Sequence, residues 1–186
     1  MRKSVLFIAM SLDGYIADKH GGVSWLSGQN PALESQDAYA QFVQGVDTVV
    51  MGWTTYHQVA AELSPCERVY SALTSYVITH REIASTKQIR FVDESPGDLV
   101  RRLKKDPGKD IWICGGANIV HQLLQENLID LFFISVIPTI LGSGTRLFGS
   151  LDRELKLNLI RTQSFNGITE LVYEMRDNAS GGADET

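Results

Sequence analysis

The chain has 186 residues, of which 44% are hydrophobic and 21% are charged. This is the length of a single domain with an ordinary globular composition, so disordered and fibrous classes are excluded. The formal net charge is −5, from 17 basic and 22 acidic residues, which argues against a nucleic-acid partner. The longest apolar stretch, 131–137, contains Ser135 and is far shorter than a membrane-spanning helix, so we expect no membrane insertion.

The cysteines and the two ends of the chain carry further expectations. Cys66 and Cys114 belong to no CxxC motif or Cys/His pair at metal-binding spacing, so we expect no metal site and a reducing, cytoplasmic location. The apolar run behind Met1 is too short for a signal peptide. Residues 177–186 lack a hydrophobic pattern, which predicts a disordered tail after a single domain spanning 1–176.

Continuous apolar runs alternate with amphipathic stretches along the chain, and such runs are typical of strands covered on both faces. The pattern predicts strands at 5–10, 46–51, 76–79, 89–92, 111–114, 131–140, 155–162 and 170–175, and helices at 38–43, 54–61, 98–105 and 117–126. Ser95 and Pro96 stand in the cap and first-turn positions of the third helix. We therefore expect an α/β fold with three layers: a doubly wound, mostly parallel sheet of about eight strands with an antiparallel C-terminal edge.

Basic residues gather around the end of the helix at 98–105. A solvated helix end that complements the helix dipole explains them, and a nucleic-acid-binding helix is the weaker alternative. The residues are Arg101, Arg102, Lys104, Lys105 and Lys109.

Two glycines stand directly between the strand at 111–114 and the helix that follows it. Ligands of such sheets bind beyond the carboxyl ends of the strands. Gly115 and Gly116 would let a phosphate approach the backbone, and the amides of Ala117 and Asn118 at the start of the helix favour an anion. A tight turn with no ligand is the alternative.

The strand at 46–51 ends in the same way, with Gly52, Trp53, Thr54 and Thr55. The threonines either cap the next helix or bind a second phosphate. A further strand end, Thr79-His80-Arg81, would place a cation beside this turn, unless Arg81 is an idle surface residue. Two anion sites on adjacent strands suit a dinucleotide with an extra 2′-phosphate.

The substrate side is less well defined by the sequence. A long loop before the first helix contains Trp25 and is typical of an active-site cover. A reductase needs a proton donor, and the carboxylates near the expected pocket are Asp13, Glu34 and Asp37, although Asp13-Gly14 also reads as a simple turn. Arg146 lies in a glycine-rich loop, where it would hold an anionic substrate or pair with a carboxylate.

Five segments occur in the order found in the dihydrofolate-reductase-like superfamily. They are 7–17, 23–26, 49–56, 113–117 and 138–148. The set resembles most closely the reductase half of the bacterial riboflavin deaminase–reductase, over about residues 3–176.

The resemblance implies an NADPH-dependent reductase and a homodimer paired through the sheet edge. It implies that residues 52–55 and 79–81 hold the 2′-phosphate and that Gly115 and Gly116 hold the diphosphate and the nicotinamide side. Residues 9–14 would line the nicotinamide and substrate pocket. The predicted cofactor-binding residues are Ala9, Gly52, Trp53, Thr54, Thr55, Thr79, His80, Arg81, Gly115, Gly116, Ala117 and Asn118. The predicted catalytic residues are Asp13 and Asp37, and the predicted substrate-binding residues are Trp25 and Arg146.

The chain departs from this family pattern in two places. Trp53 stands where many relatives have Arg or Lys, so preference for NADPH would rest on Arg81 and the threonines. Folate-reducing enzymes carry a characteristic acidic residue, and no acidic residue of this chain occupies the matching position. Asp37 and Glu34 are only the nearest candidates. We therefore expect a reductase with a small heterocyclic substrate of the pteridine or pyrimidine type, as in dihydrofolate reductase or 5-amino-6-(5-phosphoribosylamino)uracil reductase. The alternative function is a non-catalytic sensor that binds NADP(H). The zinc deaminase signature is absent, because Pro65-Cys66 lacks its second cysteine.

Overall fold

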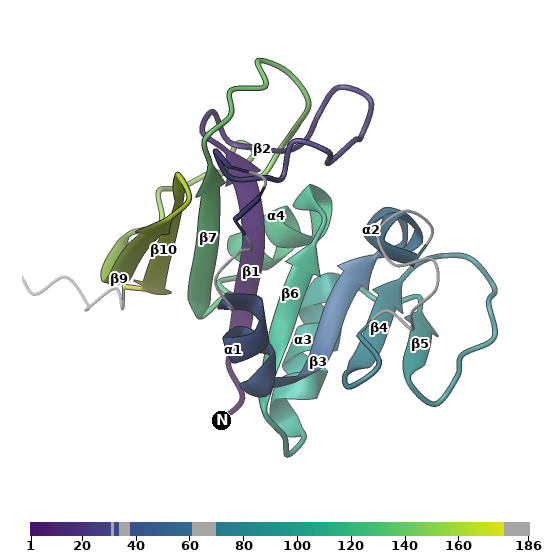
Figure 1. The fold of residues 1–186 in the computed structure, drawn as a ribbon. Coiled ribbons are helices and arrows are strands. Elements are labelled where there is room, and N and C mark those ends of the chain that lie inside the picture. Colours follow the sequence, from purple (N-terminus) through teal and green to yellow (C-terminus); the bar gives the residue numbers. More distant parts are fainter. Residues whose placement is uncertain (31, 34–37, 61–69, 177–186) are drawn as a thin grey trace, which may run out of the picture.

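The computed structural model describes residues 1–30, 32–33, 38–60 and 70–176. Their main feature is an eight-stranded sheet in the order β5-β4-β3-β6-β1-β7-β10-β9 (Figure 1). The strands are β1 (Ser4–Ser11), β3 (Val46–Gly52), β4 (Thr74–Ile78), β5 (Ile89–Val92), β6 (Asp110–Gly115), β7 (Leu131–Ile137), β9 (Leu157–Phe165) and β10 (Ile168–Met175). The helices are α1 (Ala38–Gln44), α2 (Trp53–Gln58), α3 (Pro96–Lys105) and α4 (Ala117–Gln125).

The sheet is covered by helices on both faces, which confirms the predicted three-layer α/β class. Helix α1 lies in front of the sheet and α3 and α4 lie behind it (Figure 1). Successive strand residues point to opposite faces: Ile111 and Ile113 pack in the core with α3 and α4, whereas Trp112 packs with Phe42 of α1. The predicted cap of α3 is confirmed, because Ser95 Oγ accepts a hydrogen bond from the amide of Asp98 at 3.1 Å.

The predicted antiparallel C-terminal edge is confirmed. β10 is antiparallel to both β7 and β9, so it lies inside the sheet and β9 forms the edge. A two-residue turn joins β9 and β10, and its residues Asn166 and Gly167 have φ angles of 51° and 78°. Asn-Gly favours this turn because both residues tolerate positive φ, and the turn sets the register of the hairpin.

Two differences from the predicted elements have clear physical reasons. The strand predicted to reach residue 140 ends at Ile137, because Pro138 has no amide to donate to a neighbouring strand. A second, two-stranded sheet pairs β2 (Tyr15–Ala17) with β8 (Thr145–Arg146), and such short strands carry no readable pattern. The predicted tail at 177–186 lies outside the described residues.

The basic residues around α3 are mostly engaged in ion pairs with carboxylates. Arg101 contacts Glu126, Arg102 contacts Glu94, and Lys104 contacts Asp130 at 2.6 Å. Among the described helices, none is long and apolar enough to cross a membrane. Within the same residues, no group of three or more His, Cys, Asp or Glu side chains is placed to hold a metal ion.

Candidate functional site

The two glycine turns lie side by side at the carboxyl ends of neighbouring strands. β3 pairs in parallel with β6, and Met51 is opposite Gly115 in the register. The start of α2, at Gly52, therefore lies next to the start of α4, at Gly116. The expectation that these turns share one edge of the sheet is correct.

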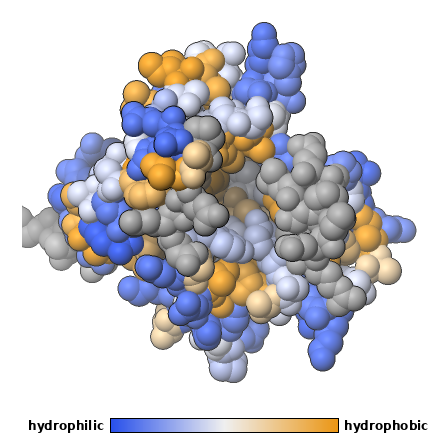
Figure 2. All heavy atoms as spheres, in the orientation of Figure 1, coloured by the Kyte–Doolittle hydropathy of each residue, from blue (hydrophilic) through white to orange (hydrophobic). Residues whose placement is uncertain are grey.

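A cavity of about 590 Å³ opens between the two turns. Figure 2 shows this face of the molecule hollowed near its middle. Eight of the predicted cofactor-binding residues line the cavity: Ala9, Gly52, Trp53, Thr54, Thr55, Gly116, Ala117 and Asn118. The two turns thus face one space that is open to a ligand.

Both helices that begin at this cavity have free first turns. Gly52 and Gly116 are the N-cap residues of α2 and α4, neither end carries a side-chain cap, and neither first turn contains an acidic residue. The interpretation of Thr54 and Thr55 as helix caps is therefore wrong, because α2 already begins at Trp53. The uncapped amides favour an anion, and more so at the longer α4.

Backbone conformation requires glycine at position 115, and glycine at the two helix starts leaves space beside neighbouring side chains. A Cβ on Gly52 would lie 3.3 Å from Ile119 Cδ1, and one on Gly116 would lie 3.5 Å from Thr55 Oγ1. Gly115 has a φ of +110°, a conformation that side-chain-bearing residues rarely adopt. The peptide bond between Gly115 and Gly116 is cis.

The strand end at 79–81 lies beside the α2 turn, because β4 pairs with β3. The guanidinium of Arg81 lies over the ring of Trp53, 4.9 Å from its centroid, and the Arg81 amide donates to Thr79 Oγ1 at 3.2 Å. His80 pairs with Asp93 instead. Arg81 therefore has a defined position next to α2, although it does not itself line the cavity.

Asp13 is engaged in holding a loop. Its carboxylate accepts hydrogen bonds from Ser11 Oγ at 2.6 Å and from the amides of Leu141 and Gly142 at 3.1 and 2.7 Å. These hydrogen bonds, that of Ser11 first, lower the pKa of Asp13 from 3.8 to about 2. A carboxyl group that is ionised at neutral pH is a poor proton donor, and Asp13 does not line the cavity. The geometry supports a positioning role rather than the predicted catalytic one, and Asp37 lies outside the described residues.

The two predicted substrate-binding residues also lie off the cavity wall. Trp25 Nε1 donates to the carbonyl of Gly22 at 3.2 Å, and its neighbours Val23 and Leu26 line the cavity in its place. The guanidinium of Arg146 lies 4.7 Å from the centroid of the Tyr15 ring, while the adjacent Thr145 lines the cavity. The cover loop is tied to α2, because Gln58 Nε2 donates to the carbonyl of Gly21 at 2.9 Å.

The end of the cavity away from the glycine turns is aromatic, and the sequence reasoning did not identify it. Phe7, Tyr39, Tyr70 and Trp112 line it together with Cys114. These aromatic residues come from β1, α1, the segment before β4, and β6. No sequence signal identified this wall, because α1 and the segment before β4 reach Trp112 only through tertiary packing.

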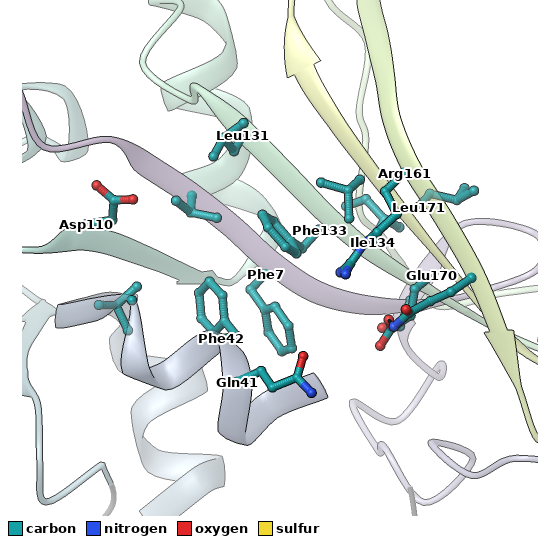
Figure 3. A pocket seen from close by; sticks show the side chains of 16 residues that line it. Phe7, Gln41, Phe42, Asp110, Leu131, Phe133, Ile134, Arg161, Glu170 and Leu171 are labelled. Atoms are coloured by element: carbon teal, nitrogen blue, oxygen red, sulfur yellow. Dashed lines mark hydrogen bonds between the residues drawn. The ribbon is translucent and has the colours of Figure 1, made fainter. Parts of the chain in front are cut away.

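A second cavity of about 260 Å³ lies between α1 and the strands β7, β9 and β10 (Figure 3). Phe7, Phe42 and Phe133 form its apolar side, and Arg161 and Glu170 point toward it from the C-terminal hairpin (Figure 3). It contains none of the predicted site residues and neither glycine turn, so the first cavity is the candidate active site.

The sheet order and the cavity between two glycine turns define an α/β protein of the dihydrofolate-reductase-like class. The model of the RibD C-terminal domain family matches residues 2–170, and the chain belongs to this family. The chain is 40% identical to the uncharacterized protein YwjB of Bacillus subtilis (strain 168) over 92% of this chain and 97% of that protein.

Two solved structures are similar over most of their length. A protein of Shewanella sp. PV-4, provisionally assigned by its name to riboflavin biosynthesis, superposes with a TM-score of 0.79 at 30% identity, covering 94% of this chain and 99% of that one. Dihydrofolate reductase from Enterococcus faecalis, solved with NADP(H), gives a TM-score of 0.63 at 12% identity and covers 94% and 97%. At that identity the reductase supports the fold alone.

Proposed function

We propose that this protein is an NADPH-dependent reductase that transfers a hydride to a small heterocyclic compound of the pteridine or pyrimidine type. One observation carries the proposal: two glycine turns with uncapped helix starts face one cavity, and Arg81 lies beside one of them. Membership of the RibD C-terminal domain family supports a reductase.

The residues at the turns fit the charge and shape of NADPH. The free amides at the start of α4, from Gly116 onward, would hold the diphosphate. The hydroxyls of Thr54 and Thr55 with the guanidinium of Arg81 would hold the 2′-phosphate. Ala9, at the end of β1, would lie against the nicotinamide ring, where its small side chain leaves room.

When bound, NADPH supplies a hydride, a hydrogen nucleus with two electrons, to the carbon atom of a C=N or C=O bond. A proton from solvent then adds to the nitrogen or oxygen atom and completes the reduction. The chain's own residues orient and enclose the reactants. Asp13 holds the 138–148 loop, and the contact between Gln58 and Gly21 holds the cover loop against α2.

A non-catalytic NADP(H) sensor is the second candidate. It is favoured by one observation: among the described residues that line the cavity, none is an acid or a histidine that could donate a proton. A sensor would bind NADPH and leave it unoxidised in the presence of pterins, pyrimidines and quinones.

We further propose that the protein works in the cytoplasm as a homodimer. The free thiol of Cys114 fits a reducing compartment. On the edge strand β9, Leu159 and Ile160 are 55% and 53% exposed, and an uncovered apolar edge favours pairing with a second copy. Sedimentation that finds only a 20.6 kDa species at micromolar concentration would contradict the dimer.

Fluorescence titration of the purified protein with NADPH tests the main proposal. We expect saturable enhancement of the nicotinamide emission well below about 1 mM, and weaker binding of NADH. Absence of binding at about 1 mM would overturn both the reductase and the sensor. Oxidation of bound NADPH by a heterocycle then separates the enzyme from the sensor.

A further inference from the structure

The cover loop of the candidate active site, residues 18–30, has a defined local shape, but none of its residues is buried. Its turns are closed by hydrogen bonds within the loop. The amide of Gly22 donates to the carboxylate of Asp18 at 2.9 Å, and Trp25 Nε1 donates to the carbonyl of Gly22 at 3.2 Å. Because a loop with few buried apolar contacts opens easily, its position depends on polar contacts with the rest of the chain.

Two residues anchor this loop to distant elements in the part of the chain that the structure describes. Near the start of the loop, Gln58 of α2 donates to the carbonyl of Gly21 at 2.9 Å. At the end of the loop, Asn166 makes three hydrogen bonds. The amide of Gln29 donates to the Asn166 carbonyl at 2.9 Å. The amide of Asn30 donates to Asn166 Oδ1, and Asn166 Nδ2 donates to the carbonyl of Asn30, both at 2.9 Å.

The loop residues that line the cavity with their side chains lie between the two anchors. They are Val23 and Leu26. Leu26 is 42% exposed, so packing within the loop does not fix its position. The distance of these two side chains from a bound ligand is therefore set by the places where the anchors hold the chain.

Asn166 is held on a firm support, the turn between β9 and β10, because these two strands pair along their whole length. β10 is antiparallel to both β7 and β9, and β7 is parallel to β1, so β9 ends at the same edge of the sheet as β1. The turn consequently reaches the cover loop beside the cavity, although Asn166 follows Asn30 by 136 positions.

The loop and the turn also approach each other closely at two glycines. A Cβ on Gly28 would lie 2.6 Å from the carbonyl oxygen of Asn166, and a Cβ on Gly167 would lie 2.5 Å from Cγ of Gln29. Real Cβ atoms do not approach other atoms this closely, so any larger residue at either position would move the loop away from the turn.

We propose that Asn166 is a positioning residue of the candidate active site, which fixes the end of the cover loop so that Val23 and Leu26 close on the bound cofactor and substrate. The inference rests on the proposed function for the identity of the cofactor. The Asn166-Gly167 pair then has two roles. Positive φ angles at both residues form the hairpin turn, and the side-chain amide of Asn166 holds the loop.

Asn166→Gly separates the two roles, because glycine adopts positive φ readily and lacks only the side chain. Hydrogen–deuterium exchange followed by mass spectrometry should show exchange about tenfold faster in residues 20–30. Stopped-flow nicotinamide fluorescence should show an NADPH dissociation rate about three- to tenfold higher, with a nearly unchanged association rate. A general loss of stability would instead reduce the amplitude of the signal and leave the dissociation rate unchanged.

Asn127→Gly is the matched control, since Asn127 also has a positive φ, of 53°. Its side chain accepts a hydrogen bond from Arg153 and makes none with the cover loop. The control variant therefore undergoes the same backbone change, and we expect the exchange of residues 20–30 and the NADPH dissociation rate to equal those of the wild type.

Gly28→Ala tests the same contact from the side of the loop. The added Cβ would lie 2.4 Å from Asn166 Nδ2, so we expect the faster exchange and faster NADPH dissociation of Asn166→Gly. The double variant Gly28→Ala/Asn166→Gly should exchange no faster than either single variant, because all three lose one contact. Additive effects would show that the two residues act separately and would contradict the inference.

The two readouts separate this inference from the proposed function. Equal exchange of residues 20–30 in Asn166→Gly and in the wild type would overturn the inference, whether or not NADPH binds. Faster exchange with an unchanged NADPH dissociation rate would also overturn it, because the loop would then be attached at Asn166 without covering the cofactor. If the wild type does not bind NADPH, the reductase proposal falls, and exchange still decides whether Asn166 holds the loop.

Discussion

The guanidinium of Arg81 lies over the indole ring of Trp53, 4.9 Å from the ring centroid. This contact joins the end of β4 to the first residue of α2. Trp53 stands where the family resemblance leads us to expect a basic residue, and its ring supports the cation of Arg81 from the neighbouring strand. The positive charge beside the turn therefore comes from a different residue than the one expected.

Arg81→Gln should lower NADPH affinity about 10- to 100-fold and leave NADH affinity nearly unchanged, because the lost charge-assisted contact reaches only the 2′-phosphate. Titration with both nucleotides by nicotinamide fluorescence measures the ratio. The matched control is Arg90→Gln, an exposed arginine on β5 that lines neither cavity. An equal loss for both nucleotides would show that Arg81 acts on the fold rather than on the phosphate.

Gly116→Ala should weaken NADPH binding by about tenfold or more with little change in the melting temperature. The added Cβ would stand in ordinary contact with Thr55 Oγ1, at 3.5 Å, but would fill the approach to the first amides of α4. Gly149→Ala is the control, since its Cβ would meet only His121 Nδ1 at 3.7 Å and the residue lines neither cavity. Normal NADPH binding by a folded Gly116→Ala variant would refute the assignment of this turn.

The hydrogen bonds of Asp13 predict a pH dependence of stability. Its pKa is lowered from 3.8 to about 2 in the folded chain, so its stabilising effect is complete above the unfolded value. The effect disappears as the pH falls from about 4 to about 2. Urea unfolding across this window should show a smaller pH dependence for Asp13→Asn than for the wild type.

The exposed Asp152→Asn is the control for this experiment, and it should follow the wild-type pH dependence. If Asp13→Asn instead removed the alkaline limb of the activity profile and left the stability profile unchanged, Asp13 would be a catalytic acid after all.

Arg2→Ala should lower the free energy of unfolding by about 2 kcal/mol, because the hydrogen bonds of the buried guanidinium are lost while the carboxylate of Asp47, 40% exposed, stays in contact with solvent. The Arg2 side chain is almost fully buried, pairs with Asp47, and donates to Thr48 Oγ1 at 2.7 Å. It fixes the start of β1 to β3. Lys3→Ala, at an exposed neighbour, is the control, and equal denaturation midpoints for the two variants would contradict this role.

The sequence was sufficient to predict features that depend on local pattern and on chain order. The apolar runs identified all eight strands of the main sheet, and Gly52 and Gly116 marked the two turns because glycine at a strand end breaks the apolar pattern. Their position on neighbouring strands was expected from the strand ends themselves and was confirmed by the pairing of β3 with β6.

Features that depend on tertiary packing could not be predicted in this way. The sequence presented Asp13 as a turn residue or a candidate proton donor, because its amide partners at Leu141 and Gly142 are distant in the chain. Tyr39 and Tyr70 meet at Trp112 only after α1 has packed on the sheet. Trp25 looked like the aromatic cover of the pocket, yet its indole turns back to Gly22, which no sequence pattern indicates.

The insertion of β10 between β7 and β9 has a consequence for synthesis on the ribosome. Six residues of β7, from Leu131 to Val136, receive their outer partners only from β10, which is made near the end of translation. Until then the growing chain displays an unsatisfied strand edge beside Phe133, a template for joining other nascent chains. Premature termination before Met175 should therefore yield aggregates in the cell rather than a shorter working protein.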